Sequence, residues 1–236
     1  MNVIILAGGY GYRMGSDTIK LPKPLIKIGS KPILFYIIKL FINAGVNKII
    51  ISGGYKSSLI KKYINKIKFK ISVIVVNTGI NTETGGRILL VKKFLDKNKD
   101  FMVTYGDGLA NINLKKLVKF HKKNNKIGTV TAVRPLARFG EIKILKNLVK
   151  SFKEKPQVNK GWVNGGFFIF KYKFLKYIKN KKSILEKYPL ESITKINNLI
   201  AFKHKGFWQC MDTRREKKIL TDFLFKNKTP PWISND

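Results

Sequence analysis

The chain has 236 residues, enough for one large α/β domain or two small ones around a sizeable core. Lysine and arginine total 48 against 13 acidic residues, a formal net charge of +35, yet 44% apolar and 12% aromatic residues exclude a disordered basic protein. Only six of the 48 are arginines, and the 42 lysines are accompanied by 31 isoleucines and 19 asparagines, a combination typical of codon bias. Because proteins that read bases favour arginine, we interpret the charge as a solvated surface and expect no specific nucleic-acid partner.

The single cysteine, Cys210, excludes a disulfide framework and a cysteine-based zinc site, and it is typical of a reducing compartment. No apolar run approaches the ~18 residues that a membrane span requires. The apolar run 3–7 lacks the preceding basic residues of a signal peptide and leads directly into glycines. We therefore predict a cytoplasmic protein with no membrane partner.

Strands and helices alternate along the first half of the chain. Strands of the kind buried on both faces are predicted at 3–7, 48–52, 71–76, 101–105 and 128–133. Helices are predicted at 33–41, 57–66, 87–97 and 114–124. This alternation predicts a right-handed, doubly wound, mostly parallel α/β sheet of the Rossmann type.

The second half carries shorter alternating runs, which predict an antiparallel portion inserted in the same sheet. These runs lie at 139–145, 148–153 and 162–170, and a helix is predicted near 172–180. Pro230-Pro231-Trp232 is expected to follow the last helix and to dock a tail. Since we find no repeat and no linker, we predict a single domain over residues 1–236.

Three predicted strands end in glycines, and ligands of open α/β sheets bind beyond the carboxyl ends of the strands. These ends, which we expect to meet at one crevice, are Gly8/Gly9/Gly11, Gly53/Gly54 and Gly106/Asp107/Gly108.

The first of these ends is Leu6-Ala7-Gly8-Gly9-Tyr10-Gly11-Tyr12-Arg13. Its glycines let backbone N–H groups approach an anion, and Arg13 adds a planar set of donors suited to phosphate. In Pro22-Lys23-Pro24 the prolines are expected to aim Lys23 at the same pocket. The alternative is a glycine turn with no ligand. The sequence matches neither the Walker pattern nor Gly-x-Gly-x-x-Gly.

Two aspartates are candidate Mg²⁺ ligands. Asp107 lies between glycines at a strand end, and Asp212 follows an aromatic-rich strand, where no capping role is evident. The alternatives are an Asp-Gly turn at 107 and a structural carboxylate at 212. We interpret His121 and His204 as surface or partly packed residues without a catalytic role.

The glycine-containing loop at 6–13, which we call the phosphate loop, and the Pro22-Lys23-Pro24 element resemble the signature of the sugar-1-phosphate nucleotidyltransferases. Later segments resemble the glucose-1-phosphate cytidylyltransferase branch, in family order over essentially the whole chain. They are Thr84-Gly85-Gly86-Arg87, Tyr105-Gly106-Asp107-Gly108, Arg138-Phe139-Gly140, Phe152-Lys153-Glu154-Lys155-Pro156, Asn164-Gly165-Gly166-Phe167-Phe168, Pro189-Leu190 and Gly206-Phe207-Trp208-Gln209-Cys210-Met211-Asp212-Thr213.

The resemblance implies Mg²⁺-dependent transfer of a nucleotidyl group from CTP to glucose 1-phosphate, giving CDP-glucose and pyrophosphate. It also implies a nucleotide-binding half at 1–133, a sugar-binding half at 134–236, a homo-oligomer, and supply of deoxysugars for surface polysaccharide. Asp107 and Asp212 would converge on one Mg²⁺, Arg13 and Lys23 would contact the triphosphate, and Lys155 would grip the sugar phosphate.

Further binding residues are implied in the same way. The nucleotide would be bound by Leu6, Ala7, Gly8, Gly9, Gly11, Thr84, Gly85, Gly86 and Asp107, with Thr84–Gly86 near the base. The sugar would be bound by Gly140, Glu154, Lys155, Asn164 and Gly165. Since both substrates are anions, positioning and charge neutralisation supply most of the catalysis, and no protein nucleophile or general base is required.

Two features depart from the family pattern. Tyr12 stands where a small hydroxyl residue usually precedes the loop arginine, and residues 66–70 pass directly into the strand at 71–76, where the branch has a longer excursion. The open alternatives are another nucleoside triphosphate or sugar 1-phosphate, a catalytically silent nucleotide-sugar-binding subunit, and a basic nucleic-acid-binding protein.

Overall fold

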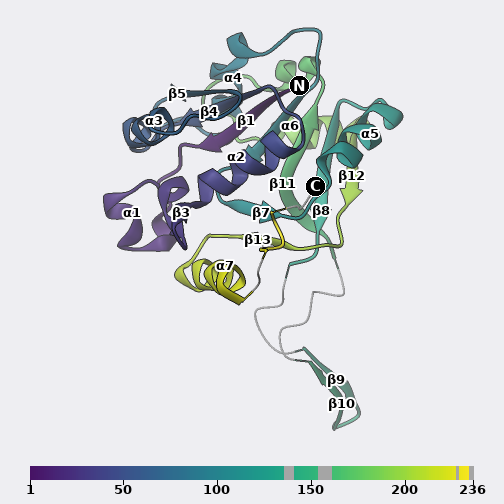
Figure 1. Cartoon of the computed structure of the whole chain (residues 1–236). Coiled ribbons are helices and arrows are strands. Elements are labelled where there is room, and N and C mark those ends of the chain that lie inside the picture. Colours follow the sequence, from purple (N-terminus) through teal and green to yellow (C-terminus); the bar gives the residue numbers. More distant parts are fainter. Residues whose placement is uncertain (136–140, 154–160, 227–228, 234–236) are drawn as a thin grey trace.

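A seven-stranded sheet forms the centre of the computed structural model, which describes residues 1–135, 141–153, 161–226 and 229–233 (Figure 1). The strand order is β12-β8-β11-β6-β1-β4-β5. Four neighbouring strands run parallel: β1 (Asn2–Ala7), β4 (Lys48–Gly53), β5 (Ser72–Asn77) and β6 (Phe101–Tyr105). The predicted doubly wound, mostly parallel sheet is confirmed.

The half of the sheet beyond β6 contains the antiparallel portion. Strand β11 (Val163–Phe170) runs antiparallel to β6 and to β8 (Gly128–Val133), and β12 (Leu199–Lys203) pairs parallel with β8. Strands β9 (Glu141–Leu145) and β10 (Leu148–Lys153) form a separate hairpin. The sequence pattern predicted β9, β10 and β11 as strands, but the expectation that all three belong to the main sheet was wrong, because only β11 pairs with it. The pattern also missed β12, which is only partly buried.

The helices flank the sheet on both faces (Figure 1). The α-helices are α1 (Asp17–Lys20), α2 (Ile33–Asn43), α3 (Ser57–Asn65), α4 (Thr84–Leu90), α5 (Leu114–Asn124), α6 (Tyr188–Lys195) and α7 (Arg214–Lys226). The 3₁₀-helices are η1 (Tyr12–Met14), η2 (Lys23–Leu25), η3 (Lys92–Phe94) and η4 (Tyr172–Tyr177). Two small antiparallel pairs are β2 (Lys27–Ile28) with β3 (Lys31–Pro32), and β7 (Gly108–Ala110) with β13 (Trp208–Cys210). None of the helices in the described residues has the length and apolar character needed to cross a membrane.

Two predicted helices differ from the structure. The helix expected at 87–97 begins at Thr84 and ends at Leu90, and the one expected at 172–180 is the 3₁₀-helix η4. Helix α4 starts early because Gly85 and Gly86 let it approach the 181–183 segment closely. A Cβ at Gly86 would lie 2.2 Å from the Lys181 carbonyl oxygen. Packing between distant segments therefore sets this helix start.

The core has two layers because both faces of the sheet are covered. In β1, Val3 and Ile5 belong to the cluster that α2 and α3 cover, whereas Ile4 and Leu6 belong to the cluster on the opposite face. Successive side chains of a strand point to opposite faces, so a strand buried on both faces is apolar throughout. This explains the continuous apolar runs at 3–7 in β1 and 49–51 in β4.

The tail after α7 docks on this core, as predicted. Trp232 is only 2% exposed, and its ring lies 6.1 Å from that of Tyr36 and 5.4 Å from that of Phe207. The C-terminal tail therefore adds an aromatic contact between α2 and the loop before β13.

We expect Trp232→Ala to lower the free energy of unfolding by about 3–5 kcal/mol, because it removes a buried aromatic ring. Phe225→Ala is the matched control, since Phe225 is 77% exposed near the end of α7 and its truncation should change stability by less than about 0.5 kcal/mol. Urea denaturation followed by circular dichroism measures both. Equal stabilities of the two variants would contradict the docked tail.

Candidate active site

A cavity of about 610 Å³ opens at the carboxyl ends of β1 and β6. Its lining comes from the loop after β1, the Pro-Lys-Pro element, the 80–87 segment and the turn after β6. The lining residues are Leu6, Ala7, Gly8, Gly9, Tyr10, Gly11, Tyr12, Arg13, Lys23, Pro24, Ile80, Asn81, Thr82, Glu83, Thr84, Arg87, Tyr105, Gly106, Asp107, Lys182 and Asp212. Most of the predicted nucleotide-binding residues, with Arg13, Lys23 and both aspartates, thus meet at one cavity.

The phosphate loop turns sharply at Gly11, whose φ is +72°. A Cβ there would meet Thr18 at 3.0 Å and the Cβ of Lys23 at 3.1 Å, so both the backbone conformation and the space favour glycine. The Thr18 hydroxyl donates to the Gly15 carbonyl at 3.0 Å, which fixes the segment that follows. The loop therefore wraps closely around Lys23.

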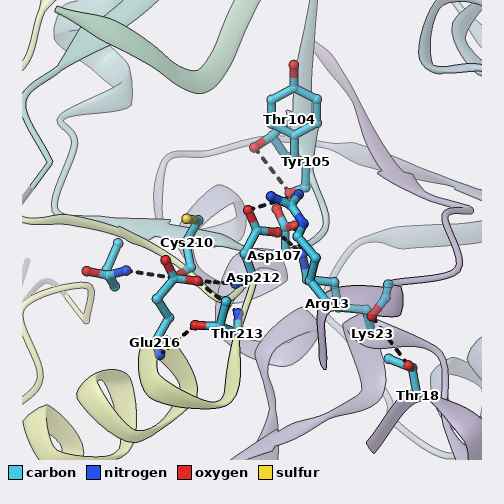
Figure 2. A network of polar contacts seen from close by, with 12 residues as sticks. Arg13, Thr18, Lys23, Thr104, Tyr105, Asp107, Cys210, Asp212, Thr213 and Glu216 are labelled. Atoms are coloured by element: carbon cyan, nitrogen blue, oxygen red, sulfur yellow. Dashed lines mark hydrogen bonds and ion pairs between the residues drawn. The ribbon is translucent and has the colours of Figure 1, made fainter. Parts of the chain in front are cut away.

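Lys23 joins the two aspartates. Its ammonium forms ion pairs with Asp107 Oδ2 and with Asp212 Oδ1, and Arg13 Nη2 lies 3.1 Å from Asp212 Oδ2 (Figure 2). The Lys23 side chain is 12% exposed and the Asp107 and Asp212 side chains 24% and 23%, whereas Arg13 is 73% exposed. The two carboxylates thus converge on one cation at the cavity wall.

The charge state of Lys23 follows from two opposing effects. Burial lowers the pKa of an ammonium, but the Asp107 and Asp212 carboxylates and their hydrogen bonds outweigh burial and raise the pKa of Lys23. Lys23 is therefore charged at neutral pH.

The pairing of two short strands brings the aspartates together. Asp107 lies in the turn between β6 and β7, and Asp212 follows β13, which pairs with β7 so that Cys210 lies opposite Gly108. The Met211 amide donates to the Asp107 carbonyl at 2.8 Å, which extends the ladder by one step. Carboxylates far apart in the sequence thus occupy adjacent ends of one β-ribbon.

Arg87 is a residue whose role sequence reasoning missed. Its buried guanidinium donates to Gly53 O at 3.0 Å, Thr78 Oγ1 at 2.7 Å, Gly79 O at 3.0 Å and Gly8 O at 3.0 Å. Burial lowers the pKa of Arg87, although an arginine remains charged at neutral pH. Arg87 therefore fastens the phosphate loop to the end of β4 and adds a fixed positive charge to the cavity wall.

The glycines at the end of β4 contact Arg87. We expected Gly53 and Gly54 at the crevice, but neither lines the cavity. A Cβ at Gly54 would lie 2.5 Å from Arg87 Nη1 and 2.7 Å from the Gly8 carbonyl oxygen. This part of the prediction was wrong because Gly54 makes room for the buried Arg87 side chain, and Gly53 packs against Ser57, where a Cβ would lie 2.7 Å from the Ser57 Cβ.

Some predicted binding residues lie outside the cavity lining. Gly85 and Gly86 face the 181–183 segment, and the Gly86 amide already donates to the Ser183 carbonyl at 3.0 Å. Gly165 is buried and accepts a hydrogen bond from Trp208 Nε1 at 2.7 Å. Gly140, Glu154 and Lys155 lie outside the residues that the structure describes.

Glu186 links the predicted nucleotide and sugar sides, and no sequence signal marked it. Its carboxylate accepts hydrogen bonds from Thr84 Oγ1, at 2.7 Å, and from the Tyr105 hydroxyl. Asn164 Nδ2 donates to the same hydroxyl at 3.2 Å, which places Asn164 beside the cavity-lining Tyr105. Burial and the Glu186 carboxylate raise the pKa of Tyr105, so its phenol stays protonated.

The thiol of Cys210 lies close to the Asp212 and Glu216 carboxylates. Burial, and then the carboxylates of Glu216, Asp212 and Asp107, raise the pKa of Cys210 to about 12, so the thiol is neutral at physiological pH. A neutral thiol is a poor metal ligand, whereas Asp107 and Asp212 offer the oxygens that Mg²⁺ prefers. These two aspartates are the residues best suited to hold a hard cation.

The cavity is built to bind anions rather than to attack with a side chain. Among its described lining residues there is no histidine or cysteine. His121 is instead fully buried on α5, with Nδ1 2.7 Å from Thr129 Oγ1, so the expectation of a surface or partly packed residue was wrong. His204 is partly buried with Nε2 near the Phe207 carbonyl oxygen, as expected. The arrangement can neutralise phosphates and position them.

Comparison with known proteins supports this chemistry. The family model described as Nucleotidyl transferase matches residues 2–214. The chain is 37% identical to glucose-1-phosphate cytidylyltransferase of Salmonella typhimurium over 98% of both chains. It is 36% identical to a probable glucose-1-phosphate cytidylyltransferase of Bacillus subtilis, covering 90% of this chain and 92% of the relative. Mannose-1-phosphate guanylyltransferase catalytic subunit beta of Xenopus tropicalis is 30% identical over 99% of this chain and 68% of its own.

Solved structures share the fold. HddC from Yersinia pseudotuberculosis superposes with a TM-score of 0.72 at 26% identity, covering 94% of this chain and 98% of its own. A UDP-glucose pyrophosphorylase complexed with UDP-glucose gives 0.74 at 19% identity, which shows likeness of fold alone.

The role of Arg87 predicts different outcomes at adjacent glycines. A Cβ at Gly8 would lie 2.0 Å from the Arg87 guanidinium, which is held by several hydrogen bonds, whereas a Cβ at Gly9 meets nothing within 4 Å. We expect Gly8→Ala to lower the free energy of unfolding by about 1–3 kcal/mol and Gly9→Ala to change it by less than about 0.5 kcal/mol. Thermal unfolding measures the midpoint of each variant. Equal midpoints for the two variants would contradict the close packing of the Arg87 guanidinium against Gly8.

Proposed function

The chain belongs to the nucleotidyl transferase family, and on that premise we propose that it transfers the cytidylyl group of CTP to glucose 1-phosphate. The products are CDP-glucose and pyrophosphate. The observation that carries the proposal is the convergence of Asp107, Asp212, Lys23 and Arg13 at the phosphate loop. This cluster offers both carboxylate oxygens for a metal and fixed cations for phosphates.

The choice of substrates rests on the names of relatives that this chain matches over nearly their full length. The Xenopus relative, named a guanylyltransferase for mannose 1-phosphate, supports a second candidate in which another nucleotide or sugar phosphate is used. A panel of substrates separates the two, because both candidates share the same phosphate chemistry.

Asp107 and Asp212 fit a divalent cation because their carboxylates already converge on one positive group, the Lys23 ammonium. When bound, Mg²⁺ neutralises the phosphate oxygens and orients the reacting phosphorus for in-line attack. In the absence of substrate, Lys23 compensates the two carboxylates. If the ammonium turned to entering phosphates, Asp107 and Asp212 would be free to hold Mg²⁺, which would supply this charge neutralisation.

The remaining side chains position the substrates. Arg13 presents its planar donors at the open side of the cavity, and the amides of the phosphate loop add further donors for the triphosphate. Arg87 contributes a fixed charge from beneath the loop. The attacking phosphate oxygen is ionised at neutral pH, so these groups need only hold it in line with the departing pyrophosphate.

The substrate test is pyrophosphate release with Mg²⁺, each of four nucleoside triphosphates and several sugar 1-phosphates. We expect CTP with glucose 1-phosphate to give the highest kcat/KM. Asp107→Asn and Asp212→Asn should each lower kcat by about 10²-fold or more, because each removes a carboxylate proposed to hold the metal that neutralises the phosphates. Asp96→Asn, at an exposed turn, is the control and should retain full activity. Equal rates for all pyrimidine and purine nucleotides would refute the proposed specificity.

The Lys23 ion pairs predict how the free protein binds metal. In wild-type protein without nucleotide we expect weak Mn²⁺ binding, because the ammonium neutralises the site. Lys23→Met keeps the aliphatic stem and removes the charge, so it should bind Mn²⁺ about 10-fold more tightly, a change of ~1.4 kcal/mol. Lys20→Met, at the exposed end of α1, is the control. Electron paramagnetic resonance of free Mn²⁺ measures this, and unchanged binding in Lys23→Met would contradict the idea.

A further inference from the structure

Glu216 lies in the first turn of α7, four residues after Asp212. Its Oε2 accepts the Asp212 amide at 2.7 Å and the Thr213 amide at 2.9 Å (Figure 2). In return, the Glu216 amide donates to Thr213 Oγ1 at 3.3 Å. This reciprocal arrangement is a capping box, in which Thr213 and Glu216 satisfy donors at the start of the helix.

This capping box differs from an ordinary one because it also binds the amide of the residue before the N-cap. One captured amide belongs to Asp212, whose carboxylate pairs with Lys23 and Arg13. On the other side, the Met211 amide is held by the Asp107 carbonyl. The backbone on both sides of Asp212 is therefore fixed, which restricts the directions in which its carboxylate can point.

Glu216 acts through the backbone of Asp212. Its Oε2 accepts from two amides at the start of α7, and its carboxylate also lies near the Cys210 thiol and the Asp212 carboxylate. Glu216 also does not line the cavity. It is therefore placed to orient Asp212 without touching the substrates.

We propose that Glu216 is a positioning residue that holds the Asp212 carboxylate toward Lys23 and Asp107. The inference rests on the proposed function, because it assigns Glu216 to the reaction in which Asp212 holds the metal. Without the carboxylate of Glu216, the peptides at 212 and 213 lose their acceptor and the loop can turn the Asp212 side chain away. The effect should fall on the metal and on kcat, and should leave the sugar-phosphate KM nearly unchanged.

The experiment compares Glu216→Ala and Glu216→Gln with a matched control. The glutamine oxygen can accept both amides, so Glu216→Gln should keep the geometry. Glu191→Ala removes an exposed first-turn glutamate from α6, at a distance from Asp212 in the chain, and reproduces the loss of a favourable charge at a helix start. Mn²⁺ binding is measured in the presence of a CTP analogue that cannot be cleaved between the α- and β-phosphates, alongside kcat, KM and the thermal midpoint.

We expect Glu216→Ala to weaken Mn²⁺ binding and to lower kcat, each by about 10–100-fold, with the sugar-phosphate KM within about 3-fold of wild type. Glu216→Gln should restore both values to within about 3-fold. Glu191→Ala should match wild type in metal binding and kcat. These results together would support positioning over a stability effect.

Asp212→Asn in the same assay separates the inference from the proposed function. If Asp212→Asn binds Mn²⁺ as wild type does, the proposed metal site fails and the positioning role fails with it. If Asp212→Asn is defective while Glu216→Ala binds metal and turns over as wild type does, the positioning role alone is overturned. It is also overturned if Glu216→Gln is as defective as Glu216→Ala, since the charge and not the acceptor would then matter.

Discussion

The contact on which the site depends is the Lys23 ammonium held between the Asp107 and Asp212 carboxylates. Two partly buried carboxylates side by side repel each other unless a cation lies between them. Lysine supplies that cation from within the chain, so the site can fold before any ligand arrives. On the proposed function, entering phosphates would compete with the carboxylates for the ammonium. Folding and substrate recognition therefore use one set of charges.

The rest of the fold sets the position of this contact. Asp107 follows strand β6, and the pairing of β7 with β13 places Asp212 beside it. Lys23 lies in η2 and contacts both carboxylates. Burial of the central sheet on both faces makes the strand ends rigid, and a ligand site on rigid strand ends needs little reorganisation. The capping box of Thr213 and Glu216 extends this rigidity to the loop that carries Asp212. The hydrogen bonds of Arg87 extend it to the phosphate loop.

The sequence predicted the sheet and the main site residues because both leave local signals. Apolar runs that end in glycine mark buried strands and their carboxyl ends, and the glycine loop with Arg13, Lys23 and Asp107 follows from them. Glu186 leaves no such signal, since it acts on partners that the fold brings near. Thr213 and Glu216 have the spacing of a capping box, but the hydrogen bond from the Asp212 amide to Glu216 is seen only in the structure. Helix α4 was predicted too late for the same reason, because the 181–183 segment fixes its start. Local chemistry can be read from the chain, whereas contacts between distant segments need the structure.

Arginine is the more informative cation in a chain so rich in lysine. Lysine serves solvated surfaces well, so 42 of them carry little information about any single position. Several arginines make close contacts in the described part of the chain. Arg87 donates to acceptors in several directions at once, Arg13 lies against Asp212 at the cavity, and the guanidinium of Arg134 lies 4.5 Å from the centre of the Trp162 ring. A lysine ammonium can pair with Asp212, as Lys23 does, but it cannot replace the planar, multidirectional donors of the Arg87 guanidinium. Arg13 and Arg87 are therefore the arginines whose contacts bear most directly on the cavity.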